Sequence, residues 1–165
     1  MNAIEQRASV RQYTDEPVTD EEVRAILRAA MAAPSAGNQQ PWEFYVVRDA
    51  GQREALAACS PYAKPCLRAP LVLAFCQRAD VRWPSMVAQD MGACVENALL
   101  EVAELGLGAV WMGIYPLEDR VRATGEVLAL PDGLETFALV AVGHPDKPVV
   151  AQGPSRFDES RIHWE

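Results

Sequence analysis

Four short apolar runs constrain the fold of this 165-residue chain more than any other feature. Each run is either rich in aromatic and β-branched residues or continuously apolar, which is typical of buried strands. The runs cover residues 42–47, 70–76, 109–113 and 136–142. The sequence therefore predicts four strands.

Three segments carry apolar residues at helical spacing. The first begins at a capping box, with Thr19 as N-cap and Glu22 three positions later, and leads directly into a loop at Pro34. The second is a long helix over residues 85–105, and the third covers residues 117–128. Helices that alternate with strands ordinarily favour a doubly wound parallel sheet. Periodicity alone does not distinguish that sheet from an antiparallel one.

Length and charge bound the class of protein. A chain of 165 residues fits a single domain, here residues 1–165. The formal charge of −8 argues against a nucleic-acid partner, because duplex binding needs a basic surface. No apolar run approaches the ~18 residues of a membrane helix, and residues 1–9 lack the apolar centre of a signal peptide. These observations predict a cytoplasmic protein without a membrane partner.

The four cysteines are Cys59, Cys66, Cys76 and Cys94, and no two of them form a C-x-x-C pair. Neither histidine stands at a metal-ligand spacing from them, so no metal site is predicted. Disulfides are one possibility for four cysteines. Cys76 ends an apolar run and Cys94 lies in a helical pattern, which favours reduced, buried thiols.

The loop over residues 34–42, Pro-Ser-Ala-Gly-Asn-Gln-Gln-Pro-Trp, is rich in small and amide side chains. Prolines fix the backbone near both ends, and Ala36 and Gly37 allow a ligand to approach the backbone closely. Ser35, Asn38 and Gln40 supply hydrogen-bonding groups. Such a loop is suited to a polar planar ligand, although the same residue types also make ordinary turns.

The N-terminal segment places Arg7, Ser9 and Arg11 within five residues. Guanidinium groups match phosphate oxygens bidentately, so this spacing is suited to a phosphate. Two arginines near a terminus are also common as solvated surface charges. The segment alone leaves both interpretations open.

In this order, Arg7-x-Ser9-x-Arg11, the loop 34–42, the glycine-rich run 106–113 and the segment 156–161 resemble the FMN-dependent nitroreductase family over nearly the whole chain. The resemblance implies an α+β fold with a mixed, largely antiparallel sheet of four to five strands flanked by helices. It also implies a homodimer, in which residues 146–165 form an exchanged C-terminal tail that reaches the partner subunit.

By the same resemblance, FMN lies at the subunit interface. The residues that would bind its phosphate are Arg7, Ser9, Arg11 and Arg156. The residues that would contact its ring system and ribityl chain from the other subunit are Pro34, Ser35, Ala36 and Asn38, with Gln40 as a further polar group of that loop. The segment whose backbone N–H groups would face the reactive nitrogen of the flavin is Met112, Gly113 and Ile114.

The activity implied is electron transfer from NAD(P)H through bound flavin to a nitroaromatic, quinone or similar small acceptor, by a ping-pong mechanism. No catalytic side chain is predicted, because the flavin itself carries the electrons. The sequence departs from the family pattern at Ala8, where a second arginine is common, and at Pro154, where some relatives have a basic residue. The alternative is a flavin-binding or redox-sensing homodimer without turnover.

Overall fold

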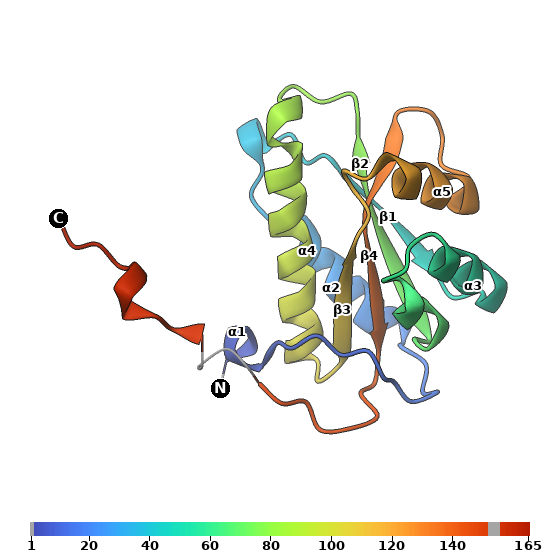
Figure 1. Ribbon diagram of the computed structural model, residues 1–165, viewed down its shortest axis with the longest axis horizontal. Coiled ribbons are helices and arrows are strands. Elements are labelled where there is room, and N and C mark those ends of the chain that lie inside the picture. The colour runs from blue at the N-terminus through green and yellow to red at the C-terminus, as the bar shows by residue number, and fades with distance from the viewer. Residues whose placement is uncertain (1, 152–155) are drawn as a thin grey trace.

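The computed structural model describes residues 2–151 and 156–165, and its centre is a four-stranded sheet (Figure 1). All three strand pairings are antiparallel, in the order β1-β2-β4-β3. The strands are β1 (Trp42–Val47), β2 (Leu71–Arg78), β3 (Gly108–Gly113) and β4 (Leu134–Gly143). All four predicted strands are confirmed.

A doubly wound parallel sheet is therefore wrong for this chain, and the α+β fold is correct. Val47 at the end of β1 lies opposite Val72 near the start of β2, so the connecting segment leaves and returns at the same end of the sheet. The spacing of apolar residues does not indicate whether neighbouring strands run parallel or antiparallel. The expected mixed character reduces to one isolated parallel bridge, between Ser9 and Ala109.

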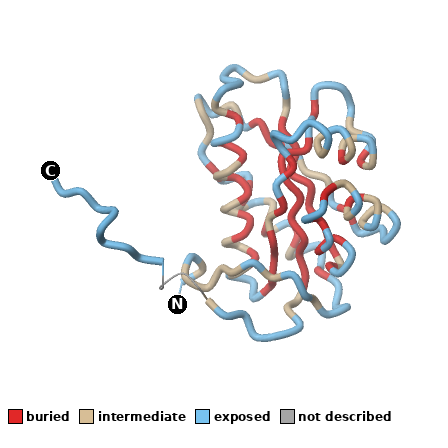
Figure 2. The backbone as a smooth tube through the Cα atoms, in the orientation of Figure 1, coloured by how far each residue is buried: buried red, intermediate tan, exposed pale blue. Residues whose placement is uncertain are grey.

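Helices cover both faces of the sheet. Helices α2 (Asp20–Met31) and α4 (Val87–Glu104) lie on one face, and α3 (Ala50–Ala58) and α5 (Glu118–Leu128) lie on the other (Figure 1). The strands are the most deeply buried part of the chain (Figure 2). The short helical elements are α1 (Ala3–Gln6) and the 3-10 turns η1 (Ala36–Asn38), η2 (Lys64–Leu67), η3 (Pro84–Met86) and η5 (Glu159–Arg161).

The two cores explain why the sequence forms these layers. Alternate residues of β2 point to opposite faces, so Phe75 packs with Met91 of α4, and Val72 packs with Leu56 of α3. Every residue of β2 except the last is buried. A strand that is covered on both faces needs a continuous apolar run, and residues 70–76 supply it.

Helix boundaries agree with the capping signals. Thr19 forms the predicted capping box with Glu22, and α2 follows it directly. The helix predicted over 85–105 begins at Val87 after a 3-10 turn, and the chain leaves it at Gly106 in the left-handed region, at φ 72°. The helix predicted over 117–128 is α5.

Burial raises the pKa of the cysteine thiols. Cys66, Cys76 and Cys94 are buried and free, and desolvation raises the pKa of each to about 12. Cys59 at the end of α3 is half-buried, and its pKa is raised by the same cause. The prediction that Cys76 and Cys94 are buried is confirmed.

Residues 156–165 are exposed, and beyond Arg156 they lie apart from the body of the molecule (Figure 1). Phe157 and Trp164 expose 74% and 85% of their surface. Pro154, noted in the sequence, lies outside the described residues. In the described ranges, every helix is too short or too polar to span a membrane.

Candidate functional site

The N-terminal segment is fastened along the outer edge of β3. Ser9 and Ala109 form a parallel bridge, and the Val10 N–H donates to the Ala109 carbonyl at 2.9 Å. Gly108 makes this approach possible, because a Cβ at that position would lie 2.7 Å from Val10 Cγ1. These contacts fix the backbone that carries Ser9 and Arg11.

Three of the four predicted phosphate-binding residues meet in one cleft, which we call the basic cleft. Ser9, Arg11 and Arg156 line it, and its volume is about 490 Å³. Lys147 and Asp146 also line it, so three cationic side chains face one carboxylate in a protein of net charge −8. Lys147 was missed in the sequence, although a basic residue soon after the last strand is a signal that could have found it.

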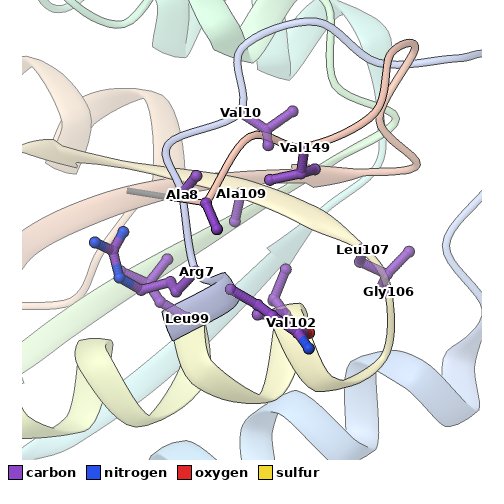
Figure 3. A pocket seen from close by; sticks show the side chains of 12 residues that line it. Arg7, Ala8, Val10, Leu99, Val102, Gly106, Leu107, Ala109 and Val149 are labelled. Carbon is purple, nitrogen blue, oxygen red and sulfur yellow. The ribbon is translucent and has the colours of Figure 1, made fainter. Parts of the chain in front are cut away.

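Arg7 lies elsewhere. Its Nε is 3.3 Å from Glu96 Oε1 on α4, and its side chain lines a neighbouring apolar cavity with Leu99 and Val102. Figure 3 shows the Arg7 guanidinium directed away from Val10. The structure therefore does not place Arg7 in the basic cleft with Arg11.

The end of β3 offers backbone donors on its outer edge. In an antiparallel pair, successive residues direct their N–H and C=O groups to opposite sides. The Ala109 carbonyl faces outward to Val10, so Trp111 and Gly113 also face outward. The Ile114 N–H instead donates inward to the Phe137 carbonyl, and the Ile114 side chain is fully buried. Of the three predicted backbone positions, Gly113 is the one that faces outward.

A second hollow, which we call the β3 cleft, opens beside Gly113 and has a volume of about 550 Å³. Arg11 lines both the basic cleft and the β3 cleft, so the two clefts are neighbours that share its side chain. The other residues that line the β3 cleft are Tyr62, Val110, Trp111, Met112, Tyr115, Pro116, Leu117 and Arg120. Tyr62 and Arg120 were not predicted, because distant segments bring them here.

The loop after α2 holds a strained conformation. Asn38 and Gln40 have φ values of 56° and 46°, in the left-handed region that L-residues rarely adopt. The Ser35 hydroxyl accepts a hydrogen bond from the Gln40 N–H at 3.0 Å. Pro34, Asn38 and Gln40 are exposed, so the loop presents its polar groups outward. Strain of this kind occurs where the surrounding structure imposes it, often at ligand sites.

A buried carboxylate imposes this conformation. Asp90, in the first turn of α4, accepts from the Ala36 N–H at 2.9 Å and from Gln39 Nε2 at 2.6 Å. Gln39 Oε1 in turn accepts from the Trp83 N–H at 2.9 Å. Sequence reasoning missed Asp90, whose signal is one acid within an otherwise apolar helical stripe.

The loop and the basic cleft lie at different levels of the same helix. The loop is tied to Asp90, whereas Ala8 lies beside Val102, twelve residues further along α4. A rise of 1.5 Å per residue separates those two helix positions by about 18 Å. Neither cleft is lined by a residue of the range 34–40. One protomer therefore does not bring the loop and the clefts together.

The fold and the two clefts define an α+β protein with a cationic hollow next to a second cleft at the backbone edge of a strand. The sequence profile described as the Nitroreductase family matches residues 4–60 and 58–144. The chain belongs to the nitroreductase family.

Several relatives match this chain over nearly its full length. A protein of Archaeoglobus fulgidus, provisionally named NADH dehydrogenase/NAD(P)H nitroreductase, is 38% identical over 168 residues, covering 100% of this chain and 97% of that protein. A solved structure provisionally named NADH oxidase, from Clostridium acetobutylicum, has 41% identity and a TM-score of 0.95, covering 99% of each chain. A provisionally named nitroreductase from Desulfovibrio desulfuricans was solved in complex with FMN, with 35% identity and a TM-score of 0.83, covering 99% of this chain and 94% of that one.

Proposed function

We propose that this protein is an NAD(P)H-dependent flavin oxidoreductase that binds FMN between two copies of the chain. We further propose that it delivers electrons to a nitroaromatic, quinone or similar small acceptor. The observation that carries the proposal is the position of Arg11, which lines both clefts. A ligand with an anionic end and a planar end fits that arrangement.

The donor groups of the basic cleft match a phosphate. The side chains of Ser9, Arg11 and Arg156 supply a hydroxyl and two guanidinium groups, and Lys147 adds a third positive charge. Charge-assisted hydrogen bonds of this kind contribute about 1.5–3 kcal/mol each. We assign these four residues to the FMN phosphate, and we assign Arg7 to the support of the segment through Glu96.

The backbone at Gly113 suits the planar end. A Cβ built on Gly113 meets no protein atom within 4 Å, so this position opens into the cleft. Bound there, FMN would supply a group that accepts hydride from NAD(P)H and passes electrons to a second substrate, so donor and acceptor would bind in turn at one face. The outward Gly113 N–H supplies a hydrogen-bond donor, and the Arg11 guanidinium supplies a positive charge. Both would stabilise the flavin ring system, which becomes more anionic when it is reduced.

A second copy of the chain completes the site. Because the loop 34–40 and the clefts are separate within one protomer, we assign Pro34, Ser35, Ala36, Asn38 and Gln40 to the cofactor bound by the partner. The exposed Phe157 and Trp164 of the tail supply apolar surface for the same contact, which fits a single domain of residues 1–165 with a tail from residue 146.

Anaerobic mixing tests the proposal. We expect purified protein to be yellow, to sediment as a dimer, and to lose its flavin absorbance when NADH or NADPH is added. Addition of nitrobenzene or a quinone should then restore the absorbance. Protein that stays colourless after incubation with FMN, or bound flavin that does not bleach with either nucleotide, would contradict the proposal.

A further inference from the structure

The β3 cleft has a marked charge asymmetry. Its lining includes two guanidinium groups, from Arg11 and Arg120, and all other lining side chains are uncharged. The protein as a whole carries a charge of −8. The overall negative charge does not attract anions to the protein. The two guanidinium groups, with no carboxylate in the lining, therefore give this cleft a local preference for anions.

Arg120 is held in place without an acidic partner. Its Nη1 donates to the Gly113 carbonyl at 3.4 Å, and its guanidinium carbon lies 5.3 Å from the centre of the Tyr62 ring. In the described ranges 2–151 and 156–165, no carboxylate forms an ion pair with Arg120. Asp119, the nearest acid in sequence, pairs with Arg122 instead. Most of the five guanidinium donors are therefore available to a ligand.

The neighbouring side chains favour an aromatic ligand. Tyr62 is 71% exposed and Tyr115 is 40% exposed, and both line the cleft with Trp111. Exposed aromatic faces of this kind stack on planar rings. Arg120 contacts the carbonyl of Gly113, whose N–H we assigned to the cofactor, so a ligand held by Arg120 lies next to the redox centre.

We propose that Arg120 is a specificity-determining residue that selects aromatic electron acceptors bearing a carboxylate. The ring of the acceptor packs against Tyr62 and Tyr115, and its carboxylate accepts hydrogen bonds from the guanidinium. This inference rests on the proposed function. For a nitrobenzoate, one NADH and one proton reduce the nitro group to a nitroso group, with release of NAD⁺ and water.

The test compares 4-nitrobenzoate with 4-nitrobenzamide, a neutral compound of nearly the same shape. Binding to the oxidised holoprotein is measured by calorimetry without NADH, so the result does not depend on turnover. We expect tighter binding of the nitrobenzoate. Arg120→Gln should weaken nitrobenzoate binding about tenfold or more and leave nitrobenzamide binding within about twofold. Arg120→Lys should retain part of the preference.

Arg122→Gln is the matched control, because Arg122 lies on the same helix but is exposed and paired with Asp119. It should change neither affinity. Equal affinity of the wild-type protein for both compounds would overturn the inference, and so would an equal loss of both in Arg120→Gln. If Arg120→Gln weakened only the binding of NADH or NADPH, Arg120 would be assigned to the phosphates of the donor, and the inference would be overturned. Flavin bleaching by NADH, followed on the same samples, reports failure of the proposed function separately.

Discussion

The carboxylate of Asp90 accepts a hydrogen bond from Gln39 Nε2 at 2.6 Å and so joins the start of α4 to the loop that follows α2. Only 5% of the Asp90 surface is exposed. The amide orientation of Gln39 is fixed by the Trp83 N–H, which needs its oxygen. The side chain at position 90 therefore has to accept hydrogen bonds from both the Ala36 N–H and Gln39 Nε2. The two oxygens of a carboxylate accept one bond each.

Asp90→Ala should lower the free energy of unfolding by about 1–3 kcal/mol, because it leaves the Ala36 N–H without its acceptor. It also removes the shorter of the two hydrogen bonds that Gln39 Nε2 donates, and the bond to the Trp83 carbonyl at 3.2 Å remains. Urea denaturation at a fixed protein concentration measures this. Asp80→Ala, at an exposed position, is the control and should change stability by less than about 0.5 kcal/mol. Equal stability of the two variants would show that the Asp90 contacts do not hold the loop.

Arg11→Glu should abolish FMN retention and leave the fold intact. Arg11 is exposed and lines both clefts, so the change reverses a charge beside the proposed phosphate without opening the core. The flavin-to-protein absorbance ratio after gel filtration measures retention, and circular dichroism checks the fold. Arg24→Glu makes the same charge change on the exposed face of α2 and should keep its flavin. Wild-type occupancy in Arg11→Glu would refute the phosphate assignment.

Gly113→Ala tests whether a ligand approaches the strand edge. The added methyl group meets no protein atom within 4 Å, so stability should stay within about 0.5 kcal/mol of wild type. FMN affinity should fall on the order of tenfold, which corresponds to about 1.4 kcal/mol. Gly125→Ala in α5 adds a methyl group that also meets no protein atom, and it should raise stability by about 0.5–1 kcal/mol with unchanged FMN affinity. Unchanged affinity in both variants would place the ligand elsewhere.

Stability should fall in alkaline solution. Burial raises the pKa of Cys66, Cys76 and Cys94 from 9.0 to about 12, so the folded protein retains protons that the unfolded chain releases. Their contribution is complete below pH 9 and is lost as the pH rises from 9 towards 12. Three such thiols give a slope of up to about 4 kcal/mol per pH unit.

Urea denaturation at pH 7.5, 9.5 and 10.5 measures that slope. In Cys94→Ala one thiol is absent, so the slope between pH 9.5 and 10.5 should be about one third smaller, whatever the stability at neutral pH. A slope that is identical in the variant and the wild type would mean that Cys94 does not contribute to it.

Local sequence signals predicted much of the fold. The capping box at Thr19 located α2, and the apolar runs located all four strands. Helix α3 was not predicted, although Asp49 caps it, because Leu56 is its single buried residue and leaves no apolar stripe. Strand direction came from the family resemblance, since it depends on where each connection returns to the sheet.

From the residues alone, the site was predictable only where neighbours in sequence are neighbours in space, and the place of Arg156 came from the family resemblance. Ser9 and Arg11 share one extended segment, and their pairing was visible in the sequence. Asp90 and Arg120 acquire their partners through tertiary contacts, with Gln39 and with the Tyr62 ring. An isolated acid or arginine in a helix carries no sign of such a partner. The position of Arg7 beside Glu96 likewise depends on the packing of α4.

Strand β3 is the last strand of the sheet, and the N-terminal segment covers its outer side only near Ala109. The backbone groups of Trp111 and Gly113 face outward beside the cleft, and an uncovered strand edge of this kind is a template for pairing with another chain. Bound FMN would therefore cover this strand edge and hinder such pairing, in addition to its role in electron transfer.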